Sequence, residues 1–302
     1  MNNYPIATIL GGGGFIGRYL VRNLTKKNFR CIIPTRNPFT KGYLKTQAPA
    51  GAIEIINFSK KNFDEIKNAI NNSDVVINLC GILYENRKQK FNTIHVDLPE
   101  TIANLCTQAN VKKFIHVSAI GASKESKSKY QQSKFLGEEK ALNNFKNTVV
   151  IRPSVVCGSE DNFTNLFAKL SLSPIIPVVN MNYKFQPIFV NDVARAILKA
   201  IETKNNEGQI YEIGGEKTIS FGDMVKLILR IIGKKRLVVE MPMSLAKMQS
   251  TLLSLLPIPP ILTKDQCLIL SEKDNIVSGD HLTLEDLNIK PTDVEKEMEK
   301  WL

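Results

Sequence analysis

The sequence predicts an α/β protein, in which a doubly wound parallel sheet is followed by a smaller α/β region. Its 302 residues, 43% of them hydrophobic, are enough for one large domain or two closely packed ones. In the first half, short apolar runs alternate with amphipathic stretches, the pattern of a parallel sheet covered by helices on both faces. A glycine-rich turn joins the first strand to the first helix. We expect a first domain over residues 1–172 and a C-terminal region over 173–302, with parts around 186–215 packing back on the sheet.

Six apolar runs are expected to form strands, in chain order residues 6–10, 31–34, 53–56, 75–79, 113–117 and 148–151. Helices are expected between them at residues 15–26, about 62–70, about 91–109 and 130–142. In the first helix, Ile16, Leu20 and Leu24 share one face. After Arg152 prolines interrupt the pattern, and further helices are expected near 191–203 and 223–232.

Two late segments match the capping box, in which a hydroxyl and a carboxylate satisfy backbone donors at the start of a helix. These are Ser220 with Asp223 and Thr292 with Glu295. We therefore interpret Asp192, Asp223 and Glu295 as helix caps rather than catalytic groups.

Composition narrows the function classes. The formal net charge of +11 comes from scattered lysines that form no basic strip, so we expect no nucleic-acid partner. Five cysteines without C-x-x-C spacing argue against a zinc site or other metal site, and for a reducing compartment. No apolar run reaches the ~20 residues that span a bilayer, and the N-terminus lacks the features of a signal peptide. We expect a cytoplasmic protein, with peripheral contact at the inner face of a membrane left open.

Residues 11–17 read Gly-Gly-Gly-Gly-Phe-Ile-Gly and satisfy G-x-G-x-x-G between a strand and a helix. Such glycines allow a tight turn, a close approach of the backbone to a pyrophosphate, and close packing of the helix on the strand. The helix N-terminus adds amide donors and a partial positive charge for the phosphates. The motif therefore predicts a Rossmann domain that binds a dinucleotide.

The residues at the end of the second strand indicate which dinucleotide is bound. An NAD site usually has a carboxylate there, ~20 residues beyond the glycines, to bind the ribose hydroxyls. Here no acidic residue lies between the glycine turn and Glu54, and Arg36 occupies the expected position. A guanidinium there would pair with a 2′-phosphate, and Arg18 could assist. The alternative is an exposed loop arginine, so the sequence favours NADP(H) over NAD(H).

Tyr130 and Lys134 form a Y-x-x-x-K pair at the start of the helix after the fifth strand. Residues four apart share a helix face, and an ammonium beside a phenol favours the phenolate that exchanges a proton with a substrate. The spacing alone is weak evidence, because Tyr84 and Lys88 match it too, in a loop after the fourth strand. Position favours Tyr130, since it lies where the active site of this architecture is expected.

A hydroxyl that donates to the reacting oxygen is expected at the end of the fifth strand. Ser118 is present, but Ala119 occupies the position at which we would place the catalytic hydroxyl. His116, on an apolar strand, is interpreted as a core histidine. The catalytic set is therefore Tyr130, Lys134 and Ser118, and all three could be vestigial.

The chain as a whole resembles the extended and atypical short-chain dehydrogenase/reductase superfamily. Within it, the chain resembles the branch that contains the NADPH-binding accessory subunit of respiratory complex I and its proteobacterial relatives. Besides the glycine turn, the segments that carry the resemblance are residues 78–83, 116–122, 152–161, 185–194, 211–215 and 262–266.

The resemblance implies a Rossmann core with a smaller region closing over the nicotinamide end. The residues that it assigns to the cofactor, together with Arg18, are Gly11, Gly14, Phe15, Ile16, Gly17, Arg36, Phe58, Cys80, Gly81, Tyr130, Lys134 and Pro153. Among them Phe58 would lie near the adenine and Cys80 near the ribose, whereas Tyr130 and Lys134 would face the nicotinamide. In the complex I branch the nucleotide is kept as a structural ligand without known turnover, and Ala119 agrees with that picture.

Three functions compete. The first is a complex I accessory or assembly protein that holds NADP(H) structurally, so its partners would be complex I subunits or a membrane surface. The second is a free-standing NADP-dependent reductase or epimerase that uses Tyr130 and Lys134 on a small carbonyl or sugar-nucleotide substrate, with Ser118 or Ser123 replacing the lost hydroxyl. A redox sensor without catalysis is weaker, because the sequence marks no surface for its partner.

Residues 245–256 carry a helical stripe of Leu245, Met248, Leu252, Leu255 and Leu256, followed by a Pro-rich turn. Such a stripe is most often ordinary core, but its breadth also suits a partner or membrane surface.

Overall fold

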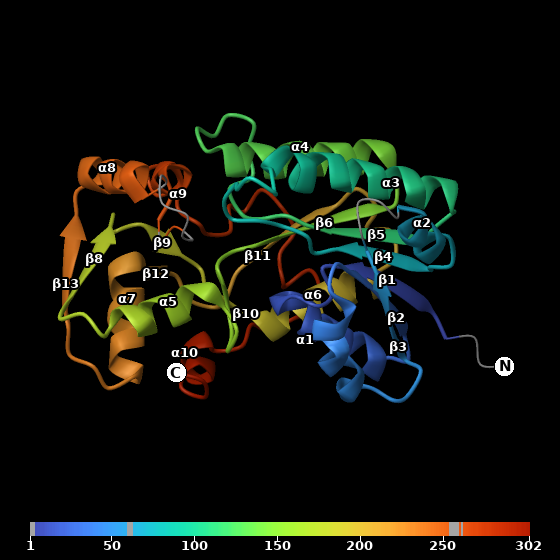
Figure 1. Ribbon diagram of the computed structural model, residues 1–302, viewed down its shortest axis with the longest axis horizontal. Helices are drawn as coiled ribbons and strands as arrows, with labels where there is room; N and C mark the ends of the chain where they lie inside the picture. Colours follow the sequence, from blue (N-terminus) through green and yellow to red (C-terminus); the bar gives the residue numbers. More distant parts are fainter. Residues whose placement is uncertain (1–3, 59–62, 254–259, 261) are drawn as a thin grey trace.

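The computed structural model describes residues 4–58, 63–253, 260 and 262–302 (Figure 1). Its centre is a seven-stranded sheet with the order β11-β6-β5-β4-β1-β2-β3, in which all neighbouring strands pair in parallel. The strands are β1 (Ile6–Leu10), β2 (Arg30–Thr35), β3 (Ile53–Asn57), β4 (Val75–Asn78), β5 (Lys113–Val117), β6 (Thr148–Pro153) and β11 (Ile210–Ile213). The doubly wound α/β fold predicted from the sequence is confirmed.

Helices cover both faces of this sheet (Figure 1). One face carries α1 (Phe15–Lys26) and α6 (Val190–Glu202), whose apolar residues join the core cluster beneath β1, β2, β5 and β6. The other face carries α2 (Phe63–Asn71), α3 (Leu98–Gln108) and α4 (Lys129–Asn144). A 3₁₀ segment, η1 (Pro38–Gln47), follows β2, and a π-helical segment, η2 (Asn92–Asp97), precedes α3.

The sheet order reverses between β1 and β4. Chain connections lead from β1 outward to β2 and β3 on one side, and from β4 to β5, β6 and β11 on the other. The loops after β1 and β4 therefore diverge at the carboxyl edge, and open α/β sheets bind ligands in a crevice at this position. The glycine turn occupies this switch point, because Leu10 pairs with Asn78 at the ends of the two strands.

The C-terminal half forms a second cluster beyond the edge of the sheet (Figure 1). Its aromatic centre is Phe163, Phe167, Tyr183, Phe185 and Phe221, whose rings meet mostly edge to face. The surrounding elements are α5 (Asn162–Leu170), α7 (Phe221–Ile231), α8 (Met243–Leu253), α9 (Lys264–Ile269), α10 (Val294–Met298), β8 (Ile175–Val179) and β13 (Leu237–Met241). Two short strand pairs complete it: β7 (Val156–Cys157) with β10 (Ile188–Phe189), and β9 (Lys184–Phe185) with β12 (Ile219–Ser220). Within the described residues, no helix is both long and apolar enough to cross a bilayer.

Most predicted strands and helices are observed, with ends within two residues of the prediction. Two differences concern the core. The stretch predicted as one helix over 91–109 is divided, because η2 has a π-helical turn before α3 begins. The sheet gains β11 as a seventh strand, which pairs with β6 from Ile210 to Ile213.

Of the two predicted capping boxes, one forms only in part and the other is wrong. Ser220 does cap α7, accepting from the Asp223 amide at 3.1 Å. The Asp223 carboxylate, however, accepts from the Ser220 hydroxyl at 2.8 Å rather than from the Ser220 amide, so Asp223 is not a cap. The cap of α10, however, is Asp293 rather than Thr292. Thr292 donates its amide and its hydroxyl to the fully buried Asp192 carboxylate, at 2.6 and 3.0 Å. Asp192 therefore ties α6 to the C-terminal segment instead of capping a helix.

Glu295 and the helical stripe also differ from expectation. Glu295 forms a surface ion pair with Arg230 of α7 and does not cap a helix. In α8, Ala246 and Ser250 are buried, whereas Leu245 and Met248 of the predicted stripe are 46% and 56% exposed. Leu255 and Leu256 of that stripe lie outside the described residues. Leu245 and Met248 thus face away from the core, whereas the Leu252 side chain is not among those described.

A buried ion cluster fastens the C-terminal segment to the sheet. Arg152 of β6 binds both carboxylate oxygens of Glu138 on α4, at 2.9 and 2.6 Å, and one oxygen of Glu212 on β11 at 3.3 Å. The Glu212 carboxylate also accepts from the Ser278 amide, and the Arg152 guanidinium lies 3.0 Å from Nε2 of His281. All three charged side chains are at most 8% exposed, so the charge of each is compensated by the opposite charge within the cluster rather than by water.

Arg152→Met should lower the free energy of unfolding by about 3–5 kcal/mol, because it leaves two carboxylates buried without a counter-charge. Urea unfolding followed by circular dichroism measures this. Arg30→Met is the matched control: Arg30 pairs with Glu54 at 2.7 Å in a half-exposed bridge, and its loss should cost no more than about 1 kcal/mol. Equal losses in the two variants would contradict the role given to the cluster.

Candidate nucleotide-binding site

The glycine turn after β1 has no room for side chains at two positions. Gly11 has φ +80°, a left-handed conformation that L side chains rarely adopt. A Cβ at Gly17, in the first turn of α1, would lie 2.4 Å from the carbonyl oxygen of Gly12, which is inside contact distance. The helix can therefore approach the turn this closely only with glycine at position 17, as the sequence motif predicts.

The N-terminus of α1 is open for an anion. Its cap residue is the exposed Gly14, which offers no side-chain hydrogen bond, and the first turn holds no acidic residue. The free amides and the helix dipole are therefore compensated by no side chain of the helix. A pyrophosphate fits this combination of bare amides and a glycine-lined turn.

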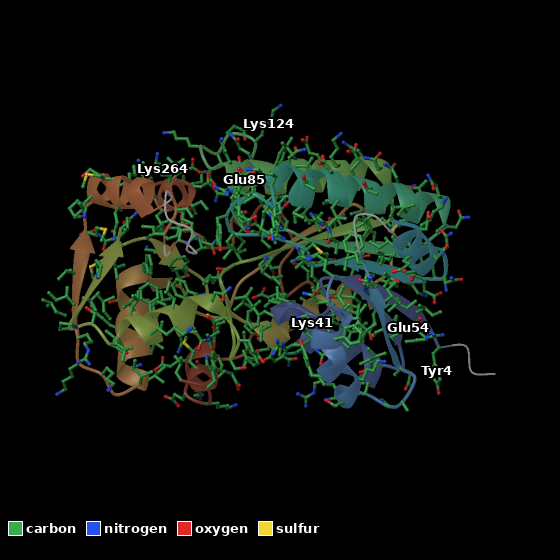
Figure 2. The ribbon with its side chains drawn as sticks, in the orientation of Figure 1. Tyr4, Lys41, Glu54, Glu85, Lys124 and Lys264 are labelled. Atoms are coloured by element: carbon green, nitrogen blue, oxygen red, sulfur yellow. The ribbon has the colours of Figure 1, made fainter. Side chains whose placement is uncertain are left out.

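The segment η1 lies against the same turn and was not predicted from the sequence. The Tyr43 hydroxyl donates to the carbonyl oxygen of Gly13 at 3.2 Å. The Lys41 side chain covers Gly13 so closely that a Cβ there would lie 2.8 Å from the Lys41 Cδ (Lys41 is labelled in Figure 2). Lys41 thus brings a positive charge to the phosphate side of the crevice, although no periodicity or motif in residues 38–47 indicates it.

The two arginines differ in their surroundings. Arg36, just after β2, is exposed, and no described residue forms an ion pair or hydrogen bond with it. Arg18 instead pairs with Glu160 at 2.7 Å and lies 5.2 Å above the ring of Tyr43. Of the two, Arg36 is the guanidinium available to a ligand, and Arg18 already has a counter-charge.

The remaining predicted cofactor residues follow the carboxyl ends of the strands. Phe58 comes directly after β3, and Cys80 follows β4 by two residues; both are partly buried against the α2–α3 side of the core. Gly81 is exposed, and Pro153 closes β6 as a buried residue. All of these lie at the edge of the sheet that carries the glycine turn.

Tyr130 and Lys134 lie on α4, beside that edge, whereas Tyr84 lies in a loop, as predicted. The Lys134 Nζ donates to the carbonyl oxygen of Val117 at 3.0 Å, which places its ammonium at the end of β5. The adjacent Ser118 is 5% exposed, and its Oγ has no hydrogen-bond partner among the described residues. A buried hydroxyl without a partner is costly unless a ligand or water completes it, so its position fits a bound group in the crevice.

Burial governs the charge states of this pair. It raises the pKa of Tyr130 to about 12, with the nearby Asp265 carboxylate adding to the effect. It lowers the pKa of Lys134 to about 8, while Glu138 and Cys80 oppose that shift. At neutral pH Tyr130 is therefore a phenol and Lys134 an ammonium. Both can donate hydrogen bonds to a ligand, but the phenolate needed for proton abstraction is disfavoured.

Residues of the C-terminal region hold the start of α4, a feature that spacing could not reveal. The Asp265 carboxylate accepts from the Ser128 hydroxyl and from the amides of Lys129 and Tyr130, at 2.7, 2.7 and 3.0 Å. Glu272 accepts from the Ser126 hydroxyl at 2.7 Å. The position of Tyr130 therefore depends on a segment more than a hundred residues away.

His95, which the sequence did not single out, is 1% exposed between α4 and the loop after β4. His116 is likewise buried, and its Nδ1 lies 3.2 Å from Nδ2 of Asn78. His116 is thus a core residue, in agreement with its interpretation from the sequence.

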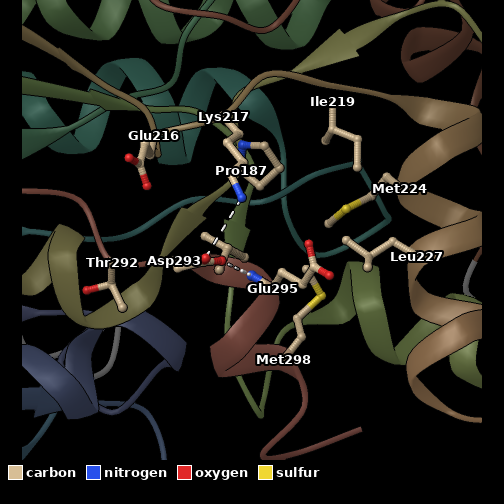
Figure 3. A pocket seen from close by; sticks show the side chains of 11 residues that line it. Pro187, Glu216, Lys217, Ile219, Met224, Leu227, Thr292, Asp293, Glu295 and Met298 are labelled. Carbon is tan, nitrogen blue, oxygen red and sulfur yellow. Dashed lines mark hydrogen bonds and ion pairs between the residues drawn. The ribbon is translucent and has the colours of Figure 1, made fainter.

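A separate pocket of about 60 Å³ lies between α7 and α10 (Figure 3). Its wall includes Ile219, Met224, Leu227 and Met298, and Lys217 pairs with Asp293 across it at 3.8 Å. This space is too small for a dinucleotide. It is lined by none of the residues predicted to bind the cofactor.

The parallel sheet and the glycine turn at its switch point define a Rossmann-type nucleotide-binding protein. Residues 7–214 match the model of the NAD dependent epimerase/dehydratase family, and the chain belongs to that family.

Sequence similarity to known proteins extends over nearly the whole chain. Subunit 9 of the NADH dehydrogenase (ubiquinone) 1 alpha subcomplex, mitochondrial, is 33% identical over 298 residues in Dictyostelium discoideum, covering 97% of this chain and 83% of that protein. The Mus musculus protein of that name is 32% identical over 293 residues, covering 96% and 78%. The ceramide reductase of Caulobacter vibrioides is 25% identical over 200 residues, 66% of this chain and 61% of that protein.

Solved structures share the fold at low identity. The UDP-glucuronic acid 4-epimerase of Bacillus cereus, in complex with UDP-glucuronic acid and NAD, matches with a TM-score of 0.73 at 18% identity, over 98% of each chain. An NADPH-dependent quinone oxidoreductase of Escherichia coli matches with a TM-score of 0.75 at 15% identity, over 97% of this chain and 98% of that one.

Gly17→Ala should weaken NADPH binding at least tenfold, because its methyl group forces α1 away from the Gly12 carbonyl oxygen and opens the phosphate-binding turn. Isothermal titration calorimetry measures the dissociation constant. The control is Gly42→Ala in η1, where no atom lies within 4 Å of the added methyl group, and whose affinity should remain unchanged. A Gly17→Ala protein that binds NADPH as tightly as the parent would refute the assignment of the turn.

Proposed function

We propose that this protein binds NADP(H) in the crevice between β1 and β4 and keeps it as a structural ligand within respiratory complex I, as an accessory or assembly subunit. The observation that carries the proposal is similarity of about 30% identity, over 95–97% of the chain, to proteins named as complex I subunits. The glycine turn and bare helix terminus supply the site for the pyrophosphate.

The preference for NADP(H) rests on charge. Arg36 is exposed without an ion-pair partner, and no carboxylate stands at the end of β2 to receive ribose hydroxyls. Lys41 adds a second positive charge beside the turn. A 2′-phosphate would receive a guanidinium in this position, whereas NAD(H) would receive no compensating carboxylate.

A structural role for the nucleotide is supported by the chemistry of the Tyr130 site. When bound, the nicotinamide supplies hydride transfer, but turnover also needs a group that exchanges a proton with the substrate. Burial keeps Tyr130 protonated, and Ala119 replaces the hydroxyl expected to polarise the reacting oxygen. Ligand that binds only the native state stabilises it by RT ln(1 + [L]/Kd), about 4 kcal/mol at a thousandfold excess, so retention without turnover has a thermodynamic benefit.

The protein would associate with the membrane peripherally, through the complex that it joins. The relatives' names supply this partner, and the positive net charge is compatible with an anionic surface.

Arg36→Glu should weaken NADPH binding about tenfold to a hundredfold and NADH binding less than threefold, since the charge-assisted contacts to the 2′-phosphate are lost. Titration with each nucleotide measures the ratio. Arg22→Glu, an exposed charge reversal on α1, should leave both affinities unchanged. Equal losses for the two nucleotides in Arg36→Glu would remove the basis for the NADP(H) preference.

Tyr130→Phe should leave the thermal midpoint of the nucleotide-free protein and the recovery of complex I subunits in affinity purification unchanged, because no described residue bonds to the phenol oxygen. Tyr84→Phe, in the second Y-x-x-x-K match, is the control. Substrate-dependent oxidation of NADPH that disappears in Tyr130→Phe but persists in Tyr84→Phe would instead establish a free-standing reductase.

A further inference from the structure

His95 bridges the loop after β4 and the helix that carries Tyr130. The Ile82 amide donates to His95 Nε2 at 3.0 Å, and His95 Nδ1 lies 2.8 Å from Ser133 Oγ. Because Nε2 accepts, the proton of the neutral ring is on Nδ1, which donates to Ser133. Ser133 in turn donates to the carbonyl oxygen of Tyr130 at 2.7 Å. The three hydrogen bonds therefore run in one direction, from the loop to α4.

The surroundings keep the ring neutral. His95 is 1% exposed, and burial lowers its pKa to about 3, with the Lys134 ammonium adding to the shift. The lone pair on Nε2 is consequently available to Ile82 throughout the physiological range.

Packing also prevents the ring from turning. It stacks on Phe91 at a centroid distance of 5.3 Å and meets the edge of Tyr130 at 5.5 Å. Its backbone is equally confined, since a Cβ at Gly137 of α4 would lie 1.8 Å from the His95 carbonyl oxygen. The π-helical turn of η2 makes this approach, and such turns often occur at functional sites.

The group that His95 holds lies at the crevice. Gly81, next to Ile82, is exposed, and a Cβ there would lie 3.7 Å from His95 Nε2 and 3.8 Å from Lys134 Nζ. The imidazole, the lysine ammonium and the backbone of the loop thus meet beside Gly81. The bond from the Ile82 amide to His95, and the bond from His95 to Ser133, connect this loop to the helix that carries Lys134.

We propose that His95 is a positioning residue for the nicotinamide half of the dinucleotide: it fixes the Gly81–Ile82 backbone relative to Tyr130 and Lys134 without touching the adenosine half. This inference rests on the proposed dinucleotide binding. The shape of the nicotinamide half of the site then depends on His95, a side chain outside the glycine motif.

His95→Phe tests the proposal, because phenylalanine keeps the ring volume and stacking but cannot accept from Ile82. The dissociation constants of NADPH and of adenosine 2′,5′-bisphosphate, which lacks the nicotinamide half, are measured side by side. NADPH affinity should fall about tenfold, which corresponds to the loss of about one hydrogen bond that holds the loop. The bisphosphate affinity should stay within twofold, and the fluorescence of bound NADPH should shift toward that of the free nucleotide.

Two further variants separate positioning from stability. His95→Gln retains an acceptor and should recover part of the NADPH affinity; if His95→Phe does not fold, an intermediate loss in His95→Gln, confined to NADPH, carries the test. His281→Phe removes an imidazole that contacts Arg152 instead of the loop, and it should leave the ratio of the two affinities unchanged.

Equal losses of NADPH and bisphosphate in the His95 variants, or no loss of NADPH, would overturn the inference. If the parent protein bound neither ligand, the proposed function itself would fail, and the ratio would not be in question.

Discussion

The uncompensated N-terminus of α1 is the constraint around which the nucleotide crevice is built. Five other helices, α4, α5, α7, α9 and α10, begin with a side chain that accepts from their first amides. At α1 the cap is Gly14, without such a bond and without an acidic residue in the first turn. The helix dipole and free amides there point at the sheet edge where the strand order reverses. Helices α3 and α6 also lack a capping side chain, but each has an acidic residue in its first turn. Because α1 has neither, its first amides remain for an anion.

The opposite wall of the crevice depends on distant parts of the chain. Asp265 holds the first amides of α4, and the Arg152 cluster joins α4, β6 and β11 to the segment near His281. The C-terminal region therefore fixes the Tyr130 end of the site, while β1 and α1 fix the phosphate end. Local sequence builds one half of the site, and tertiary contacts build the other.

This division explains what could be predicted from the sequence. The phosphate half follows from contiguous residues, so Gly11, Gly17 and the bounds of α1 were all foreseeable from an apolar strand, a glycine turn and a periodic helix. Lys41 was not, because the irregular η1 gives no periodic signal and its approach to Gly13 is purely spatial.

The errors have the same origin. Thr292 has the spacing of a helix cap, but the buried Asp192 carboxylate takes its hydrogen bonds, and Asp293 caps α10 in its place. His95 is a lone histidine between apolar residues, and only the close approach allowed by Gly137 brings it to the loop after β4. Spacing rules describe what a residue can do locally; a competing partner from elsewhere in the fold decides what it does.

Binding and turnover place different demands on the Tyr130 site, and its environment meets the first better than the second. A bound nucleotide needs donors, and at neutral pH both the Tyr130 phenol and the Lys134 ammonium are donors. Proton exchange needs a phenol with a lowered pKa, whereas burial and the Asp265 carboxylate raise that of Tyr130. The same carboxylate that anchors α4 therefore opposes the charge that catalysis would require. The Asp265 interaction therefore strengthens the scaffold and suppresses the phenolate at the same time. A protein that keeps its nucleotide for stability benefits from this contact, whereas an enzyme of this class would need another interaction to offset it.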